Sequence, residues 1–197
     1  MPVSGVPNSS LPCQSWTYFR MVFTETPLRG VYVVKTGASC DERGSFARIF
    51  SSTEFRNQGL EGSLTEVSIS SNLRKATLRG MHYQTGTFAE AKLVRAVCGS
   101  IYDVAVDLRP DSASYLRWFG IELSRANGLA LYIPKGLAHG FLTLSDDADV
   151  LYHITDTYRP GASEGFAWND ESVGIAWPFP PLVMSDRDRA LPPLVKV

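Results

Sequence analysis

From residue 31 onward the chain is a succession of short runs rich in β-branched and aromatic residues, with turn-forming residues between them. Runs of this length and composition predict short β-strands. The expected strands are 31–35, 46–50, 64–70, 92–97, 101–108, 118–123, 129–133, 140–144 and 149–155. The pattern predicts an all-β protein, and a jelly-roll barrel accommodates strands of this number and length well.

Two local patterns refine this expectation. In the segment 100–108 apolar and other residues alternate, which places Tyr102, Val104, Val106 and Leu108 on one face of a strand and Asp103 and Asp107 on the other. A capping box at residues 51–54, followed by Gly59, predicts one short helix.

The chain is long enough for one substantial core, since 44% of its 197 residues are hydrophobic. Residues 1–20 are rich in proline and serine and show no sustained period, so we expect an N-terminal extension that is flexible. Residues 21–197 are expected to form a single domain.

Charge and cysteine content limit the partners and the compartment. A net charge of −1 argues against nucleic acid or an anionic membrane as a partner. The sequence contains no long apolar run and no signal-peptide pattern. Three cysteines without C-x-x-C spacing indicate free thiols, and hence a cytoplasmic protein.

The three histidines include two in unusual surroundings. His82 follows Arg79 closely and precedes Lys92, while His139 lies in the segment IPKGLAHGF (133–141). A base that titrates near neutrality, a cation that can hold an oxyanion and an arginine suited to phosphate therefore lie within fourteen residues. This grouping favours proton transfer beside a carbonyl group of an anionic small molecule.

The segment that contains His82 is also basic. Between Val67 and Arg95 there are five cations and one anion, Glu90. A solvated basic face would explain this equally well, but the presence of His82 favours an anion-binding mouth around the base.

Three further side chains are candidates, each with a plain structural alternative. Lys92 either ends a strand or points its ammonium inward to meet an anion, such as an enolate oxygen. Tyr152 shares a face with Val150, where it is either a core tyrosine or an acid opposite the histidine. Asp188 is either a solvated charge in the C-terminal tail or the carboxylate that orients His82.

A jelly roll with a central histidine also suggests a metal site. Metal-binding jelly rolls need several histidine or carboxylate ligands on adjacent strands. Here His82 is followed by Tyr83 and Gln84, which replace imidazole poorly, so we expect no metal. Hydride transfer is disfavoured because no dinucleotide-binding glycine motif follows a strand, so we expect no cofactor.

With these candidates in place, the chain from Met21 to about Leu194 resembles the dTDP-4-dehydrorhamnose 3,5-epimerase family. The matching segments are DERG (41–44), TLRGMHYQ (77–84), KLV (92–94), DVAVDLR (103–109), IPKG (133–136), AHGF (138–141), WND (168–170) and IAWP (175–178).

The resemblance implies a cupin-type jelly roll that works without a metal, as a homodimer with strand exchange. It implies that His82 is the general base, Asp188 its partner and Tyr152 the acid on the opposite face. It places Lys92 and His139 around the ketone of a nucleotide-diphosphate 4-keto sugar. Other expected substrate contacts are Arg43 and Arg79 (diphosphate and substrate), Tyr158 (nucleobase), Glu164 and Arg187.

Two segments depart from the family pattern. The family often has glutamate at Arg48, and a Gln-x-Asn pair where this chain has Glu66 and Ser68, and these positions are expected near the ligand. The sequence therefore leaves open a CDP or GDP carrier and inversion at C3 or C5 alone. A ketoisomerase and a non-catalytic sugar-nucleotide-binding jelly roll are the remaining alternatives.

Overall fold

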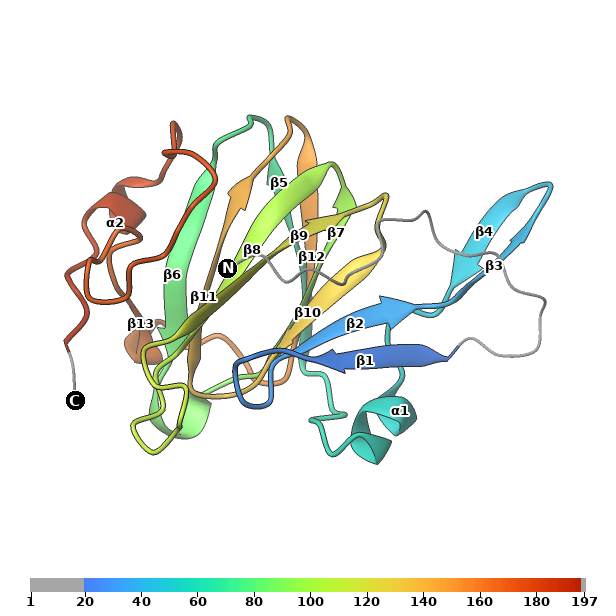
Figure 1. Cartoon of the computed structure of the whole chain (residues 1–197), viewed down its shortest axis with the longest axis horizontal. Helices are drawn as coiled ribbons and strands as arrows, with labels where there is room; N and C mark the ends of the chain where they lie inside the picture. The colour runs from blue at the N-terminus through green and yellow to red at the C-terminus, as the bar shows by residue number, and fades with distance from the viewer. Residues whose placement is uncertain (1–19, 196–197) are drawn as a thin grey trace.

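The computed structural model describes residues 20–195, in which two antiparallel β-sheets form a jelly roll (Figure 1). The six-stranded sheet has the order β1 (Met21–Glu25), β2 (Tyr32–Thr36), β10 (Leu129–Ile133), β7 (Lys92–Cys98), β12 (Ala148–Ile154), β5 (Glu66–Asn72). The five-stranded sheet has the order β13 (Ser163–Gly165), β6 (Leu78–Gln84), β11 (Leu137–Thr143), β8 (Ser100–Asp107), β9 (Trp118–Ser124). The predicted all-β jelly roll is confirmed.

The remaining elements are short. Strands β3 (Ala38–Asp41) and β4 (Gly44–Ala47) form a separate hairpin, and the helices are α1 (Ser52–Asn57) and α2 (Asp186–Arg189). Two 3₁₀ turns, η1 (Gly86–Phe88) and η2 (Pro160–Ala162), follow β6 and precede β13. The hairpin projects from the body on the side away from α2 (Figure 1).

The main core lies between the two sheets. Because side chains alternate along a strand, each sheet contributes every second residue to this layer. Val94 and Leu131 come from the six-stranded sheet, and Ala105 and Phe141 come from the five-stranded sheet. All four are almost completely buried.

The outer face of each sheet is also covered over part of its area. Helix α1 places Phe55 against Leu93 and Tyr132 on the six-stranded sheet. The C-terminal segment places Phe166 on the five-stranded sheet, next to Val104. The predicted alternation in 100–108 is confirmed, and the face that carries Asp103 and Asp107 is the inner one.

Several element boundaries differ from the sequence prediction. Helix α1 lies where the capping box predicts it, and the Ser51 hydroxyl accepts a hydrogen bond from the Glu54 amide. The strand predicted at 46–50 is wrong beyond Ala47, because residues 48–50 pair with no other strand and Phe50 packs on Phe55 of α1. The sequence prediction also missed β6, the strand that carries His82.

Glycine explains how β6 is held beside β11. Gly80 has φ +130°, and a Cβ atom built there would lie 2.5 Å from the Gly140 Cα atom. Only a residue without a side chain permits this approach of two backbones. Gly80, two positions before His82, therefore allows the strand that carries the histidine to lie close to β11.

The cysteine interpretation needs a correction. Cys98 is a free thiol, as predicted, whereas Cys40 is disulfide-bonded, so the free-thiol prediction is wrong for Cys40. Cys13 and most of the predicted extension, residues 1–19, lie outside the described residues. In the part of the chain that is described, no helix is long and apolar enough to cross a membrane.

Candidate active site

The site is built around His82 in the middle of β6. Its Nε2 atom lies 2.7 Å from Asp188 Oδ1, although the two residues are 106 positions apart in the sequence. The His82 side chain is about one-third exposed, whereas Asp188 is 5% exposed. Asp188 is therefore a buried partner of the imidazole and not a solvated charge of the tail.

Helix α2 delivers this carboxylate. The Ser185 hydroxyl accepts a hydrogen bond from the Asp188 amide and so caps the helix, and Asp188 Oδ2 accepts one from the Gly80 amide at 3.4 Å. Burial acts to raise the pKa of Asp188, but the hydrogen bonds from His82 and the Gly80 amide outweigh burial and lower it. Asp188 is consequently ionised at neutral pH.

The contact also assigns the histidine tautomer. An ionised carboxylate only accepts hydrogen bonds, so His82 Nε2 carries the proton that Asp188 accepts. In the neutral imidazole Nδ1 then has a free lone pair. Nδ1 is therefore the atom of His82 that can remove a proton from a substrate.

A second imidazole–carboxylate pair lies beside the first. His139 on β11 is the register partner of His82, and its Nε2 atom is 2.7 Å from Asp103 Oδ1. Residues opposite each other on paired strands point to the same face, so both imidazoles project inward. The side chains of His139 and Asp103 are 6% and 0% exposed.

Tyr152 on β12 faces this second pair from the opposite sheet. Its ring meets the His139 ring edge to face, with centroids 5.8 Å apart. Burial raises the pKa of Tyr152 well above its usual value, and the negative charge of Asp103 raises it further. The phenol therefore stays protonated at neutral pH and can act as a proton donor.

Lys92 is the first residue of β7 and lies on the inward face that it shares with Val94. The sequence left open whether the ammonium meets a permanent carboxylate of the protein or a charge that develops on the substrate during the reaction. The structure provides a permanent carboxylate, because Lys92 Nζ lies 2.7 Å from Glu90 Oε1. The two side chains are 13% and 5% exposed. The other Glu90 oxygen accepts a hydrogen bond from Gln84.

Other predicted substrate contacts lie on segments around this centre. Arg79 is exposed and donates through Nε to Asn72 at 2.8 Å. The Tyr158 hydroxyl accepts a hydrogen bond from Arg187 Nη1 at 3.3 Å. Because Arg187 and Asp188 are neighbours on α2, one short helix contacts both the predicted nucleobase residue and the histidine.

Three more predicted contacts belong to the same region. Glu66 Oε1 accepts a hydrogen bond from the Tyr158 amide at 3.3 Å, and Glu164 accepts one from the Tyr83 hydroxyl at 3.0 Å. Ser68 is exposed and is the register partner of Tyr152. These side chains extend from β5 and β13, the strands at one edge of each sheet.

Arg43 and Arg48 are not brought to this centre within one chain. Arg43 lies in the turn of the projecting β3–β4 hairpin and pairs with Asp41 (Figure 1). Arg48 lies 3.8 Å from Glu54 of α1, on the outer side of the six-stranded sheet.

Sequence reasoning did not assign a role to Asp103 or Glu90. An aspartate in the middle of an alternating strand was a usable signal, because a buried carboxylate needs a partner. Glu90 was visible as the one anion of the basic segment 67–95. What could not be seen was which histidine Asp103 meets, whereas Glu90 lies only two positions from Lys92 in the sequence.

The third histidine lies on the other side of the six-stranded sheet. His153 stacks on Phe50, with ring centroids 5.8 Å apart, in the outer layer covered by α1. It is therefore separated by the sheet from His139 and Tyr152. Among residues 20–195, no group of three or more histidine, cysteine or acidic side chains is close enough to hold a metal ion.

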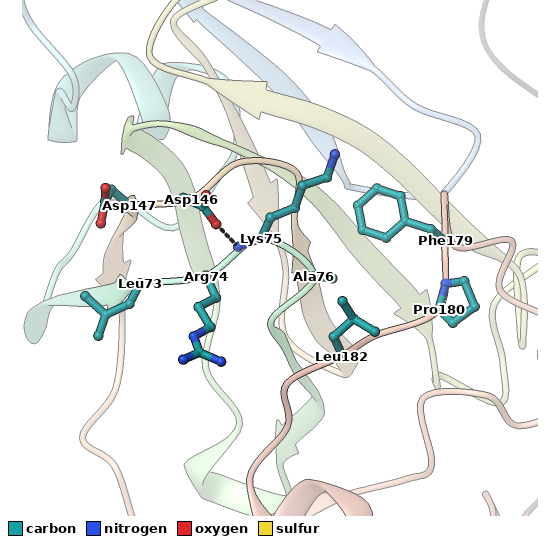
Figure 2. A pocket seen from close by; sticks show the side chains of 9 residues that line it. All are labelled: Leu73, Arg74, Lys75, Ala76, Asp146, Asp147, Phe179, Pro180 and Leu182. Carbon is teal, nitrogen blue, oxygen red and sulfur yellow. Dashed lines mark hydrogen bonds between the residues drawn. The ribbon is translucent and has the colours of Figure 1, made fainter.

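A surface pocket lies apart from these residues. It has a volume of about 880 Å³ and lies where β5 connects to β6, next to the C-terminal segment (Figure 2). Apolar side chains such as Phe179 and Leu182 line it together with Lys75 and Asp146. None of the predicted site residues lines this pocket.

Comparison with known proteins now identifies the family. The family model for dTDP-4-dehydrorhamnose 3,5-epimerase matches residues 25–196. The chain belongs to the dTDP-4-dehydrorhamnose 3,5-epimerase family. It is therefore a member of a family of isomerases, as the resemblance indicated.

Individual relatives agree with this assignment. The dTDP-4-dehydrorhamnose 3,5-epimerase of Methanothermobacter thermautotrophicus is 40% identical over 87% of this chain and 94% of its own length. The crystal structure of the Bacillus anthracis enzyme with TDP and pyrophosphate bound has 35% identity and a TM-score of 0.86, covering 89% of this chain and 100% of that one. The Legionella pneumophila epimerase in complex with dTDP-4-keto-L-rhamnose has 33% identity and a TM-score of 0.84, covering 88% and 93%.

Proposed function

We propose that this protein inverts C3, C5 or both in a dTDP-4-keto-6-deoxyhexose by proton transfer next to the C4 ketone. The observation that carries the proposal is the His82–Asp188 pair beside the inward-facing Tyr152. The imidazole has a free nitrogen that accepts a proton, and the phenol is held in the form that donates one. Both flank His139, so both can reach the same sugar ring.

His82 and Tyr152 act in sequence. His82 Nδ1 removes the proton on the carbon next to the ketone, and Asp188 stabilises the imidazolium that forms. The substrate becomes an enolate, which Tyr152 protonates from the opposite face. Placed acids and bases typically contribute about 10²–10⁴-fold each to the rate.

Lys92 and His139 stabilise the enolate oxygen. A preorganised donor at an oxyanion contributes about 3–4 kcal/mol. Inward placement of both residues, with water largely excluded, supports this role. We predict that the reaction needs no metal or other cofactor. We also predict a cytoplasmic location.

The nucleotide-diphosphate part of the substrate is assigned to the exposed residues around the centre. Arg79 supplies positive charge for the diphosphate. Tyr158 offers an exposed ring for stacking on the base, and its hydroxyl is held by Arg187. The ligands named for the related structures support a thymidine carrier, while a CDP or GDP carrier is an outcome that a substrate panel would reveal.

We also propose that the chain forms a homodimer with exchanged strands. β1 and β5 are free edges of the six-stranded sheet, and Val67 and Ile69 on β5 are 60% and 59% exposed. Exposed apolar side chains on an edge strand favour pairing with another chain. In such a dimer the β3–β4 hairpin of one chain would reach the site of the other. This would explain how Arg43 can contact the diphosphate although it lies away from the His82–Asp188 pair of its own chain.

The proposed reaction is tested by isotope exchange. The protein is incubated in D₂O with dTDP-4-keto-6-deoxyglucose, and deuterium at C3 and C5 is read by NMR and mass spectrometry. We expect the wild type to exchange both positions, or one in a mono-epimerase, and His82→Ala to exchange neither while retaining the circular dichroism spectrum of the folded protein. Exchange retained in His82→Ala would remove His82 as the base.

The same experiment separates the other functions. A ketoisomerase would move the carbonyl group, which the product spectrum shows directly. A non-catalytic binding protein would retain the substrate without any exchange.

A further inference from the structure

The partly buried Lys92 and two buried polar side chains form a chain of contacts behind the ketone site. Lys92 Nζ contacts one oxygen of Glu90 at 2.7 Å, and Gln84 donates to the other oxygen. Gln84 and Glu90 are both buried. Glu90 is therefore tied on both oxygens, once to the lysine and once to the histidine strand β6.

Gln84 is itself fixed from several directions. Its amide nitrogen lies 3.0 Å from the Phe88 carbonyl oxygen and 3.3 Å from the Thr157 carbonyl oxygen, so its two hydrogens are shared between these carbonyls and Glu90. Its amide oxygen accepts a hydrogen bond from the Arg159 amide at 2.6 Å. A carboxylate held by so constrained an amide has little freedom to turn.

Charge explains why such a fixed carboxylate matters for Lys92. A lysine side chain has four rotatable bonds, and an ammonium inside a protein is costly without a counter-ion. The attraction of Glu90 selects one position of Nζ among the many that the side chain could adopt. An oxyanion donor accelerates a reaction only when it is already in place as charge develops.

We propose that Glu90 is a positioning residue that fixes the ammonium of Lys92 at the substrate ketone. This inference rests on the proposed function, in which Lys92 stabilises the enolate. Glu90 acts through Lys92 and, by way of its bond to Gln84, ties the lysine to the strand that carries His82.

The test replaces the carboxylate with an amide of the same shape. In Glu90→Gln one side-chain oxygen remains, so the contact to Gln84 or the one to Lys92 is lost, together with the negative charge. We expect kcat for the dTDP-4-keto sugar to fall about tenfold while KM changes less than about twofold. Glu122→Gln, an exposed position on β9, is the matched control and should retain both constants.

A double-mutant cycle distinguishes positioning from a general structural role. If Glu90 acts through Lys92, Glu90→Gln should cost nothing further in a Lys92→Met background. Equal losses in the two backgrounds would overturn the inference, as would an unchanged kcat in Glu90→Gln. If Lys92→Met is itself fully active, the role of Lys92 in the proposed function is wrong.

A second measurement does not need turnover. Reductive methylation of the folded protein with formaldehyde and cyanoborohydride is followed at Lys92 by peptide mass spectrometry. We expect the modification rate to rise at least about fivefold in Glu90→Gln and to stay unchanged in Glu122→Gln. Equal rates in the wild type and Glu90→Gln would show that Glu90 does not hold the lysine, whether or not the protein is an epimerase.

Discussion

At the scale of single residues, the protein contains two imidazole–carboxylate pairs in different environments. His82 is one-third exposed and pairs with a carboxylate whose pKa is lowered, while His139 is buried with Asp103, whose pKa burial raises. An exposed imidazole can meet a substrate carbon, whereas a buried one mainly offers a fixed donor or acceptor. Environment therefore assigns the two histidines different tasks.

Tyr152 provides the test at this scale. Changing Tyr152 to Phe removes the donated proton but leaves the base, so deuterium exchange should continue while inversion slows by about 10²-fold or more. Both rates are measured by NMR in D₂O. Tyr102→Phe is the matched control, because Tyr102 is a partly buried tyrosine of the outer cluster. An equal fall in exchange and inversion would argue against Tyr152 as the opposite-face acid.

At the scale of elements, the end of β8 shows how a buried carboxylate can fasten a loop. Asp107 accepts hydrogen bonds from Arg109, Ser112 and Ser114, which follow it in the chain. Burial acts to raise the pKa of Asp107, but these bonds outweigh it and lower the pKa to about 2. Asp107, the last residue of β8, therefore fixes the loop that follows the strand.

This lowered pKa predicts a dependence of stability on pH. The stabilisation is fully present above the unfolded-state pKa of about 4 and is lost as the pH falls toward 2, with an upper bound of roughly 2.5 kcal/mol. Urea unfolding of Asp107→Asn at pH 7 and pH 3 should show a loss of stability at pH 7 that shrinks at pH 3. Asp111→Asn, in the same loop but exposed, is the control. A loss of equal size at both pH values would contradict this.

At the scale of the whole molecule, the described chain has a core that is fully covered by its two sheets and an edge strand, β5, that is exposed. Its two sheets bury their inner faces against each other, while β5 leaves Val67 and Ile69 to solvent. A surface of this kind is a liability for a monomer, since it offers both backbone donors and apolar side chains to another chain.

The proposed homodimer is tested on this edge. We expect light scattering to give twice the chain mass for the wild type and a shift toward one chain mass for Ile69→Lys, which places a charge on the edge. Val195→Lys, at an exposed C-terminal position, should leave the mass unchanged. A wild-type protein of single chain mass across the micromolar range would refute the dimer.

Local pattern in the sequence determined the fold class, most strands and the residue types of the site. Alternation and capping act over a few neighbouring residues, so they can be read from the chain directly, as for 100–108 and α1. The motifs around His82 and His139 likewise indicated proton chemistry before any geometry was known.

Only the tertiary structure decided which groups meet. Asp188 contacts His82 because α2 packs beside β6, although the two residues are 106 positions apart in the sequence. His139 contacts Asp103 because β8 pairs with β11. Lys92 has Glu90 as its neighbour because β7 and the turn before it are held by Gln84. The first two contacts join segments that are far apart in the sequence, which periodicity within a segment does not specify. Glu90 and Lys92 are only two positions apart, and the fold adds the hydrogen bond that holds Glu90 to Gln84.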